Sequence, residues 1–366
     1  MSIRTLQHED LPAAARLCAR VEGWDIAGRE AALVDYFADI ALDGPLADPA
    51  VPSLVYDDGN RGITGFILSQ SRPFSGPDGP LKMACSGPLV ADPDAGRGIG
   101  ALLLKRYLAG AQDFTVTDNA TDEVMVMWKA LGGSVNTTAS VGWTRLLGPA
   151  SVAIGFARRR RGVYEPPALG LIGTVDRVVG GPLRPQRPTG TIEPLDPGTA
   201  VELLMGMRRH FPIRPAYGDG QLRWLLDRLD GSLVRGEVVA RLVRAPGGRA
   251  LGWYVMSAAP RGVAQALQVV AAPADCDVVI DHLFAHAAEI GAAEVRGRLE
   301  PHLFPSLRER RHTTVRTDWS LVAARDGALL GSILGGGALL TRLDGEWWMQ
   351  PPYVALPDSR ARSARS

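Results

Sequence analysis

The sequence predicts a mixed α/β fold with two successive units, each a mixed twisted sheet flanked by helices. Short apolar runs typical of strands alternate with segments whose apolar residues recur at helical spacing. From Ile192 onward the same order of segments starts again. The length of 366 residues suits two domains of ordinary size, each able to bury its own core.

The first unit is expected over residues 1–150. It begins with a strand at Ile3–Leu6, and Asp10 can cap a helix that carries Pro12 in its first turn. Asp57–Asn60 lies between two apolar runs, a pattern typical of a hairpin. The later elements follow in this order: a strand over Met83–Ala91, a glycine-rich turn, a helix from Ile99 to Tyr107, a strand over Phe114–Thr117, a helix over Asp122–Leu131, and a closing strand over Val141–Leu147.

The second unit, expected over residues 190–350, repeats this order. Its elements are a strand at Ile192–Leu195, a helix from Asp196, a hairpin of Glu237–Val243 with Ala250–Met256, a strand at Gln265–Ala271, a helix around Val279–Ala287, a strand at Val295–Leu299, a helix at Leu303–Arg310 and a strand at Trp319–Ala323. Trp143 and Trp319 match in place. A repeat of roughly 150 residues indicates duplicated domains, with coincidence as the alternative.

Residues 151–189 separate the units and are rich in proline and arginine, which favours an extended linker. Within them, Arg158–Arg161 follows the apolar stretch Val152–Phe156. A solvated charge run is the favoured interpretation, and contact with an anionic membrane surface is the alternative. Residues 351–366 are predicted to form a disordered tail.

Composition excludes several classes of protein. The net charge of +1 argues against a nucleic-acid binder, because phosphate contacts need a local excess of basic residues. Cys18, Cys85 and Cys276 are far apart and have neither metal-ligand nor disulfide spacing, so reduced thiols are expected. The sequence shows no signal-peptide pattern and no apolar run of the ~18 residues that cross a bilayer. A cytoplasmic protein is therefore expected.

The most informative stretch leads from an apolar strand through a glycine-rich loop into a helix. Gly96, Gly98 and Gly100 can expose successive backbone N–H groups, and the first turn of a helix carries unpaired donors and partial positive charge. Together they form a cradle for a phosphate or pyrophosphate, to which Arg97 adds a cation. A tight turn without a ligand is the alternative. A P-loop is a poor match, because Ala101 stands where the motif needs lysine.

This arrangement, together with Leu102–Leu103, resembles the GNAT acetyltransferase superfamily. The resemblance covers residues 1–150 well and the second half only in its order of elements. It implies tandem GNAT-like domains, with acetyl-CoA as co-substrate of the first. The residues that the resemblance assigns to the cofactor are Leu89 and Val90 for the pantetheine arm, Gly96, Arg97, Gly98, Ile99, Gly100 and Ala101 for the pyrophosphate, and Asn119 for the arm.

The departures from the family pattern concern catalysis. Ala95 stands where the family usually has Gln or Arg, and Trp128 stands where a Tyr often protonates the leaving thiolate. The strand before the loop carries no Glu to serve as general base. Asp118 and Glu123 are the best substitutes, each taking a proton from an ammonium through water. A plain exposed carboxylate or a helix N-cap is the alternative for both.

The corresponding loop of the second half, Val270–Asp277, lacks glycine and carries two carboxylates, which should repel a phosphate. This half is therefore expected to be a degenerate cofactor site. His282 and His286 have the i, i+4 spacing of a metal pair, but without a third ligand in view a structural role is favoured and no metal is expected. Arg208, Arg209 and His210 form a further polar cluster to which the sequence assigns no role.

Two functions from different classes remain. The first is an enzyme that moves an acetyl or other acyl group from CoA to a primary amine of a small molecule or a peptide by direct attack. The second is an acyl-CoA-binding sensor or scaffold without turnover, which the replaced Tyr and Glu would favour. A peripheral membrane protein acting through Arg158–Arg161 is a weaker third. The residues name neither the acceptor nor the oligomeric state.

Overall fold

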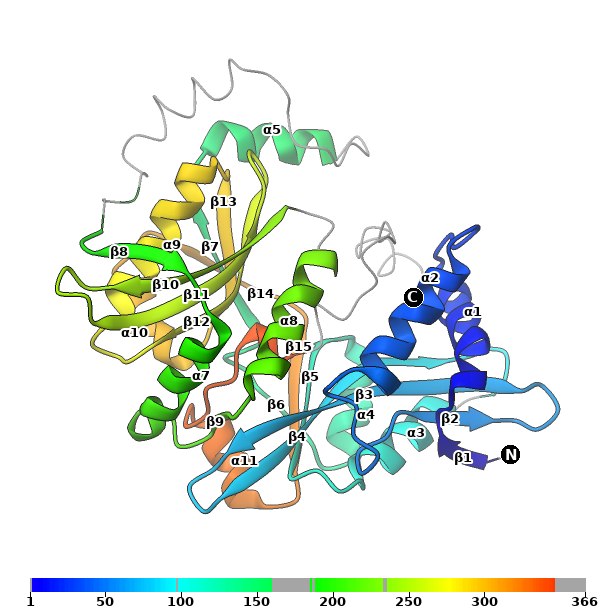
Figure 1. Cartoon of the computed structure of the whole chain (residues 1–366). Helices are drawn as coiled ribbons and strands as arrows, with labels where there is room; N and C mark the ends of the chain where they lie inside the picture. The colour runs from blue at the N-terminus through cyan, green and yellow to red at the C-terminus, as the bar shows by residue number, and fades with distance from the viewer. Residues whose placement is uncertain (1, 97, 160–184, 186–187, 233–235, 346–366) are drawn as a thin grey trace. The chain divides into compact units, whose positions relative to one another are not determined.

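The computed structural model describes residues 2–96, 98–159, 185, 188–232 and 236–345 (Figure 1). Contacts divide the chain into two compact units. The first comprises residues 1–135, 320–331 and those from 344 onward, and the second comprises residues 136–319 and 332–343. Most of the expected linker, including Arg160 and Arg161, and the expected tail lie outside the described residues.

The sheet of the first unit is mixed. Its strands lie in the order β1 (Ser2–Thr5), β2 (Leu54–Asp57), β3 (Ile63–Ser75), β4 (Pro80–Ala91), β5 (Phe114–Ala120), β15 (Trp319–Ala324) and β6 (Ser134–Val135). β1 to β4 pair antiparallel, whereas β4 and β5 pair parallel. A parallel neighbour requires a crossover, and α3 provides it.

Helices cover both faces of this sheet. They are α1 (Leu11–Glu22), α2 (Glu30–Ala38), α3 (Ile99–Leu108) and α4 (Asp122–Ala130). On one face, the rings of Phe37 in α2 and Phe66 in β3 lie 5.9 Å apart. On the other face, α3 packs against Gly65, where an added Cβ would lie only 2.6 Å from Cγ2 of Ile99. Gly65 therefore permits the close approach that sets the start of α3.

Asp10 precedes α1 as expected, but its side chain makes no hydrogen bond to the first turn of the helix. It accepts hydrogen bonds from Nη1 of Arg4 at 2.6 Å and from the backbone N–H of Gln7 at 2.9 Å. The Asp10 carboxylate thus links β1 to the turn before α1 and does not cap α1.

The second sheet is also mixed. Its strands lie in the order β14 (Thr313–Arg316), β7 (Val141–Leu146), β13 (Glu294–Arg298), β12 (Val263–Ala271), β11 (Ala250–Ala258), β10 (Glu237–Arg244) and β8 (Thr191–Pro194). Its helices are α5 (Pro149–Arg159), α7 (Pro197–Gly206), α8 (Asp219–Ser232), α9 (Cys276–Ile290) and α10 (Phe304–Arg308). The chain is therefore a mixed α/β protein with two mixed sheets flanked by helices, as expected.

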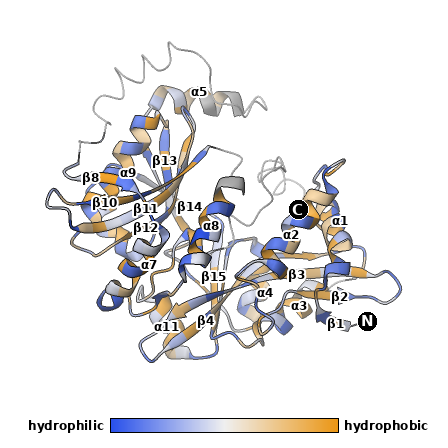
Figure 2. Cartoon of the chain, viewed as in Figure 1, coloured by the Kyte–Doolittle hydropathy of each residue, from blue (hydrophilic) through white to orange (hydrophobic). Residues whose placement is uncertain are grey.

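The core of the second unit follows the period of two along its strands. Tyr254 and Met256 of β11 join the apolar cluster that α9 covers, while Trp253 and Val255, which alternate with them, are buried outside that cluster. Most residues of β12 are also apolar, apart from Gln265 and Gln268 (Figure 2). A strand buried on both faces loses the alternation of apolar and polar residues. This explains the almost continuous apolar sequence of β11.

Two strands belong to a different sheet from the one expected. The strand expected at Val141–Leu147 to close the first unit is β7, and it lies between β13 and β14 of the second sheet. Conversely, the strand expected at Trp319–Ala323 to close the second unit is β15, and it lies between β5 and β6 of the first sheet. Apolar periodicity identifies a strand without identifying its neighbour, and consecutive strands are neighbours only about two-thirds of the time. The limits of independently folding domains stay a prediction.

Some elements were not anticipated. They include α2, α8, β14, β6 and α11 (Gly327–Leu334), and α5 occupies the apolar stretch at the start of the expected linker. Short 3-10 and π turns adjoin helices at His8–Asp10, Asp39–Asp43, Met207–Arg209 and Pro301–Leu303, and a further 3-10 turn stands alone at Arg342–Asp344. Among the described residues, none of the helices combines the length and apolar character needed to span a membrane.

Candidate functional site

The first sheet opens between β4 and β5. Their parallel pairing covers Met83–Cys85 opposite Phe114–Val116 and ends there, although β4 continues to Ala91 and β5 to Ala120. Among the described strands, β4 beyond Cys85 is paired with β3 alone. We call this opening, between Ser86–Ala91 and Thr117–Ala120, the first wedge. Its free strand edge can pair with an extended polar ligand such as a chain of amides.

A β-bulge bends β4 where the first wedge begins. Ile67 of β3 faces Leu89, whereas Ser69 faces Ser86, so β4 has one extra residue at Gly87–Pro88. A bulge increases the local twist and turns the strand away from its neighbour. Gly87 is required because an added Cβ would lie 2.9 Å from the Cβ of Leu68. The bulge therefore explains why the pairing with β5 stops.

The glycine-rich loop leads from the first wedge into α3. Gly96 and Gly98 have φ angles of +117° and +98°, which L-residues rarely adopt, and Gly98 is the N-cap of α3. Among the described residues, no side chain caps this helix start. The backbone donors of Ile99, Gly100 and Ala101 belong to the first turn and lack acceptors inside the helix. Arg97 lies outside the described residues.

Ion pairs hold this loop in place. Arg20 of α1 donates two hydrogen bonds to the carboxylate of Asp92, at 3.1 and 2.8 Å. Arg61 donates to the carbonyl of Asp94 at 2.9 Å. The hydrogen bond from Arg20 is the main reason that the pKa of Asp92 is lowered. Arg20 neutralises the carboxylate of Asp92 next to the loop. The repulsion between this carboxylate and a bound phosphate is therefore reduced.

Asp118, expected as a proton acceptor, and Asn119, expected to contact the cofactor arm, lie at the end of β5. Asp118 is buried, and its Oδ1 accepts a hydrogen bond from Oγ of Ser320 in β15 at 3.0 Å. Gly345 lies against its other oxygen, since a Cβ on that glycine would overlap with Oδ2. Asn119 is half-buried and has a φ of +48°, a conformation that is uncommon for a residue other than glycine. β5 is thus locally distorted next to the first wedge.

The other candidate residues occupy different surroundings. Glu123 is exposed on the first turn of α4, and the described residues show no contact between it and Asp118. Thr121, not Glu123, caps that helix by accepting a hydrogen bond from the N–H of Val124. Trp128 is fully buried, and its indole lies over Gly133, where a Cβ would be 2.0 Å from Cδ1. Leu89 is half-buried and Val90 is buried beside the first wedge.

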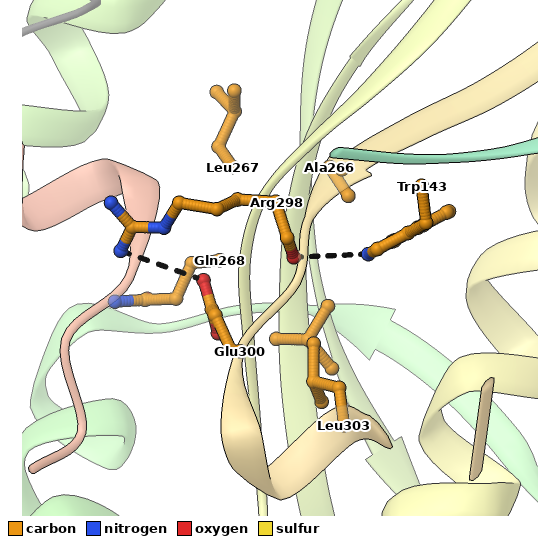
Figure 3. Close-up of a pocket in the computed structure, with 9 residues that line it drawn as sticks. Trp143, Ala266, Leu267, Gln268, Arg298, Glu300 and Leu303 are labelled. Atoms are coloured by element: carbon orange, nitrogen blue, oxygen red, sulfur yellow. Dashed lines mark hydrogen bonds and ion pairs between the residues drawn. The ribbon is translucent and has the colours of Figure 1, made fainter. Parts of the chain in front are cut away.

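The second sheet opens between β12 and β13, the strands that correspond to β4 and β5 of the first sheet. The parallel pairing of β12 with β13 covers Val263–Gln265 opposite Glu294–Arg296 and then ends. β12 is also bulged, at Leu267, because Val255 faces Gln268 while Met256 faces Ala266. We call this opening the second wedge. A small cavity lies there, lined by apolar residues and by Gln268, Arg298 and Glu300 (Figure 3).

Side chains of the protein itself fill the second wedge. Trp143 lies over Gly297 and donates a hydrogen bond from Nε1 to the carbonyl of Arg298 at 3.0 Å (Figure 3). His302 donates from Nε2 to the carbonyl of Val269, also at 3.0 Å. These bonds satisfy backbone groups that the separated strands leave without a partner.

The start of α9, which corresponds to the start of α3, is occupied by carboxylates. Asp275 forms a bidentate ion pair with Arg249 at 2.9 Å for both bonds. Asp277 in the first turn is held at 2.8 Å by Arg310, which also binds Asp281. The positive end of this helix is therefore already paired with acidic groups, which leaves it unsuited to a phosphate.

The two histidines of α9 have separate partners. His286 shares a hydrogen bond of 2.7 Å with the hydroxyl of Tyr254, and His282 donates to the carbonyl of Thr189 at 3.0 Å. Burial is the main cause of the lowered pKa of His286. In the described ranges, no three His, Cys, Asp or Glu side chains gather in a way that could hold a metal ion.

Sequence reasoning missed two features of the first wedge. The bulge was visible in the dipeptide Gly87–Pro88, because proline inside a strand pattern is confined to edges and bulges. Ser320 gave no signal, because nothing in an ordinary apolar strand identifies a partner 202 positions away.

No protein-family model matches the sequence, and no curated protein is significantly similar to it. Solved structures do share its fold. A GCN5-related N-acetyltransferase from Anabaena variabilis superposes with a TM-score of 0.57 at 11% identity, over 89% of this chain and 73% of that one. One from Kribbella flavida gives 0.54 at 15% identity, over 88% and 70%. A probable N-acyltransferase from Enterococcus faecalis gives 0.54 at 11% identity, over 88% and 72%. At these identities the likeness shows the GCN5-related N-acetyltransferase fold alone.

Proposed function

We propose that the protein is an acyltransferase that moves an acetyl or other acyl group from CoA to a primary amine. The first wedge carries this proposal. Among the described residues, it combines a strand edge that has no pairing strand with a helix start whose first backbone donors lack acceptors inside the helix. The pyrophosphate of acetyl-CoA would bind at Gly96–Ala101, and the amides of its pantetheine arm would pair with Leu89 and Val90.

The reaction would be a direct attack. The acceptor ammonium first loses a proton, and the neutral amine then forms a C–N bond to the thioester carbonyl carbon. The C–S bond breaks, the thiolate of CoA leaves with the bonding electrons, and the nitrogen loses its second proton to give a neutral amide. A backbone N–H of β4 near Val90 can stabilise the negative charge that develops on the carbonyl oxygen.

Asp118 is our preferred proton acceptor. It lies on β5 beside the first wedge, while Glu123 points from an exposed helical turn. The hydroxyl of Ser320 orients the carboxylate through Oδ1. A fixed carboxylate can remove the ammonium proton through one water molecule. Because Trp128 cannot give up a proton, the leaving thiolate would be protonated by solvent or by the group that took the ammonium proton.

A sensor or scaffold that binds acyl-CoA without turnover is the second candidate. The fully buried Trp128 at the position of the family's Tyr favours it, as does the burial of Asp118. In both cases we propose one cofactor per chain, because Trp143 and His302 fill the second wedge. We further propose that the second unit is a degenerate GNAT-like domain and that the protein acts in the cytoplasm.

Isothermal titration of the full chain with acetyl-CoA tests the binding step. Saturable binding at one site per chain is expected, and its absence would reject both candidates. Release of free thiol with a panel of small amines and lysine-containing peptides then separates the two. Thiol release that depends on the amine identifies an acyltransferase, whereas tight binding without any release identifies a sensor or scaffold.

A further inference from the structure

Four basic residues gather at the C-terminal end of α7 in the second unit. Arg208 and Arg209 lie in the 3-10 turn Met207–Arg209 that continues α7, and His210 follows directly. Arg214 lies in β9 (Arg214–Pro215). The first three side chains are exposed, whereas Arg214 is only 7% exposed. We call these four residues the basic cluster.

Contacts within the second unit fix the position of Arg214. Its Nε donates a hydrogen bond to the carbonyl of Leu204 at 3.0 Å. The same carbonyl accepts the backbone N–H of Met207, so the guanidinium lies beside the turn that carries Arg208. The neighbouring Ile213 is held by Leu339, whose N–H donates to its carbonyl at 2.8 Å. Arg214 therefore cannot swing into solvent without breaking this local structure.

Within the described ranges, no acidic side chain balances the charge of Arg214. Its Nη1 is buried and has no hydrogen-bond partner among these residues. Among the described residues, neither Arg214 nor Arg208 forms an ion pair with Asp or Glu. Burial is the main cause of a lowered pKa for Arg214, and the nearby charge of Arg208 lowers it further. A buried guanidinium that has a free donor and a cationic neighbour is unfavourable unless an anion completes the arrangement.

We propose that the basic cluster is a binding site for an oxyanion, that is, a phosphate or carboxylate group. The buried Nη1 of Arg214 supplies a fixed donor, and Arg208 closes over the anion from the solvent side. Arg209 adds positive charge at the entrance, and the ring of His210 adds a further hydrogen-bonding group there. A guanidinium suits this task because its planar donors match the oxygens of both groups.

Capping of α7 alone does not account for the cluster. The negative end of the helix favours a cation, and the bond from Nε to Leu204 serves that purpose. This role leaves Nη1 unused and gives no reason for a second arginine next to it. An anion accounts for both observations. The proposal does not depend on acyl transfer, because the basic cluster lies in the second unit and the glycine-rich loop in the first.

Thermal unfolding of the full chain in phosphate and in sodium chloride, at matched ionic strength, tests the proposal. Phosphate should raise the melting temperature in a saturable way. Arg208→Ala should weaken the apparent affinity for phosphate about tenfold or more, as expected for the loss of a charge-assisted hydrogen bond. In phosphate-free buffer the same variant should melt at the same or a higher temperature than the wild type, because it loses a like-charged neighbour. Arg214→Met should also abolish the phosphate effect.

Two controls locate the effect. Arg223→Ala removes an exposed arginine of α8 and should leave the phosphate response unchanged. Gly98→Ala disturbs the loop before α3 and should leave the component that depends on Arg208 intact. Acetate in place of phosphate shows whether a carboxylate also binds, and a gain with either anion supports the site. Arg208→Ala with a full phosphate response, or a wild type with no response to either anion, would overturn the proposal.

Discussion

Ser320 donates a hydrogen bond to Oδ1 of Asp118 at 3.0 Å, although 202 positions separate the two residues. The bond joins β15 to the end of β5 and orients a buried carboxylate next to the first wedge. A buried carboxylate needs hydrogen-bond donors to remain charged without a large energetic cost. The hydroxyl of Ser320 is such a donor, and it comes from the far end of the chain.

Asp118→Asn should reduce acyl transfer by about 10²–10⁴-fold, the range associated with loss of a general base. The affinity for acetyl-CoA should change little, because the proposed cofactor contacts come from Leu89, Val90, Gly96–Ala101 and Asn119 and not from Asp118. Titration and thiol release on the same preparation measure both quantities. Glu123→Gln is the matched control and should keep near-normal transfer. Equal losses in both variants would contradict the assignment of Asp118 as the base.

Gly98→Ala should weaken acetyl-CoA binding about tenfold or more. Its φ of +98° costs an alanine about 1–2 kcal/mol, so the loop shifts and its N–H groups leave their positions. Gly248→Ala in the β10–β11 hairpin is the matched control, because that glycine has a φ of +83° and equally open surroundings. Both variants should lose similar stability, and only Gly98→Ala should lose affinity. An unchanged dissociation constant for Gly98→Ala would argue against the loop as the cofactor site.

Stability should fall with decreasing pH because of His302. Burial is the main cause that lowers its pKa to about 4, whereas an unfolded histidine titrates near pH 6.5. Between these values the unfolded chain binds more protons, so the free energy of unfolding decreases as the pH falls through this window. The full loss is about 3 kcal/mol. Urea unfolding at several pH values measures this effect. Between pH 6.5 and 4 the free energy of unfolding should decrease less for His302→Gln than for the wild type. Above pH 7.5 the difference in the free energy of unfolding between the two proteins should stay constant.

A fragment of residues 1–150 should not fold on its own. It would lack β15, leaving β5 with an unpaired edge and Asp118 without Ser320. It would also expose β7, which belongs to the second sheet. Addition of a peptide covering residues 313–345 should increase the structured fraction, as followed by circular dichroism. A cooperative unfolding transition of the fragment alone would show that the first sheet tolerates the loss of β15.

Local signals predicted most of the elements correctly. The hairpin turn at Asp57–Asn60 and the glycine-rich start of α3 are marked by residues whose backbone preferences act over a few positions. Helix α2 was missed because Glu30–Ala38 has a short apolar pattern without a clear cap, and Arg29 caps it without a side-chain hydrogen bond.

Nonlocal relationships could not be predicted. The exchange of β7 and β15 between the sheets depends on which partner each strand finds, and their apolar patterns suit either sheet. The plug of the second wedge is another example, since Trp143 and His302 look like ordinary packing residues until their partners are known. Glycine conformations could be predicted because they are local, whereas the environment of Asp118 required the C-terminal part of the chain.

The position of β15 also constrains how the protein is made. The ribosome must add about 200 further residues after β5 before β15 emerges, which takes about 10–40 s at ordinary rates of synthesis. Throughout that interval the nascent chain carries an exposed strand edge on β5, which can pair with other chains. We therefore expect the yield of native protein in cells to depend on chaperones that hold the nascent chain, and to rise when translation of residues 121–318 is accelerated.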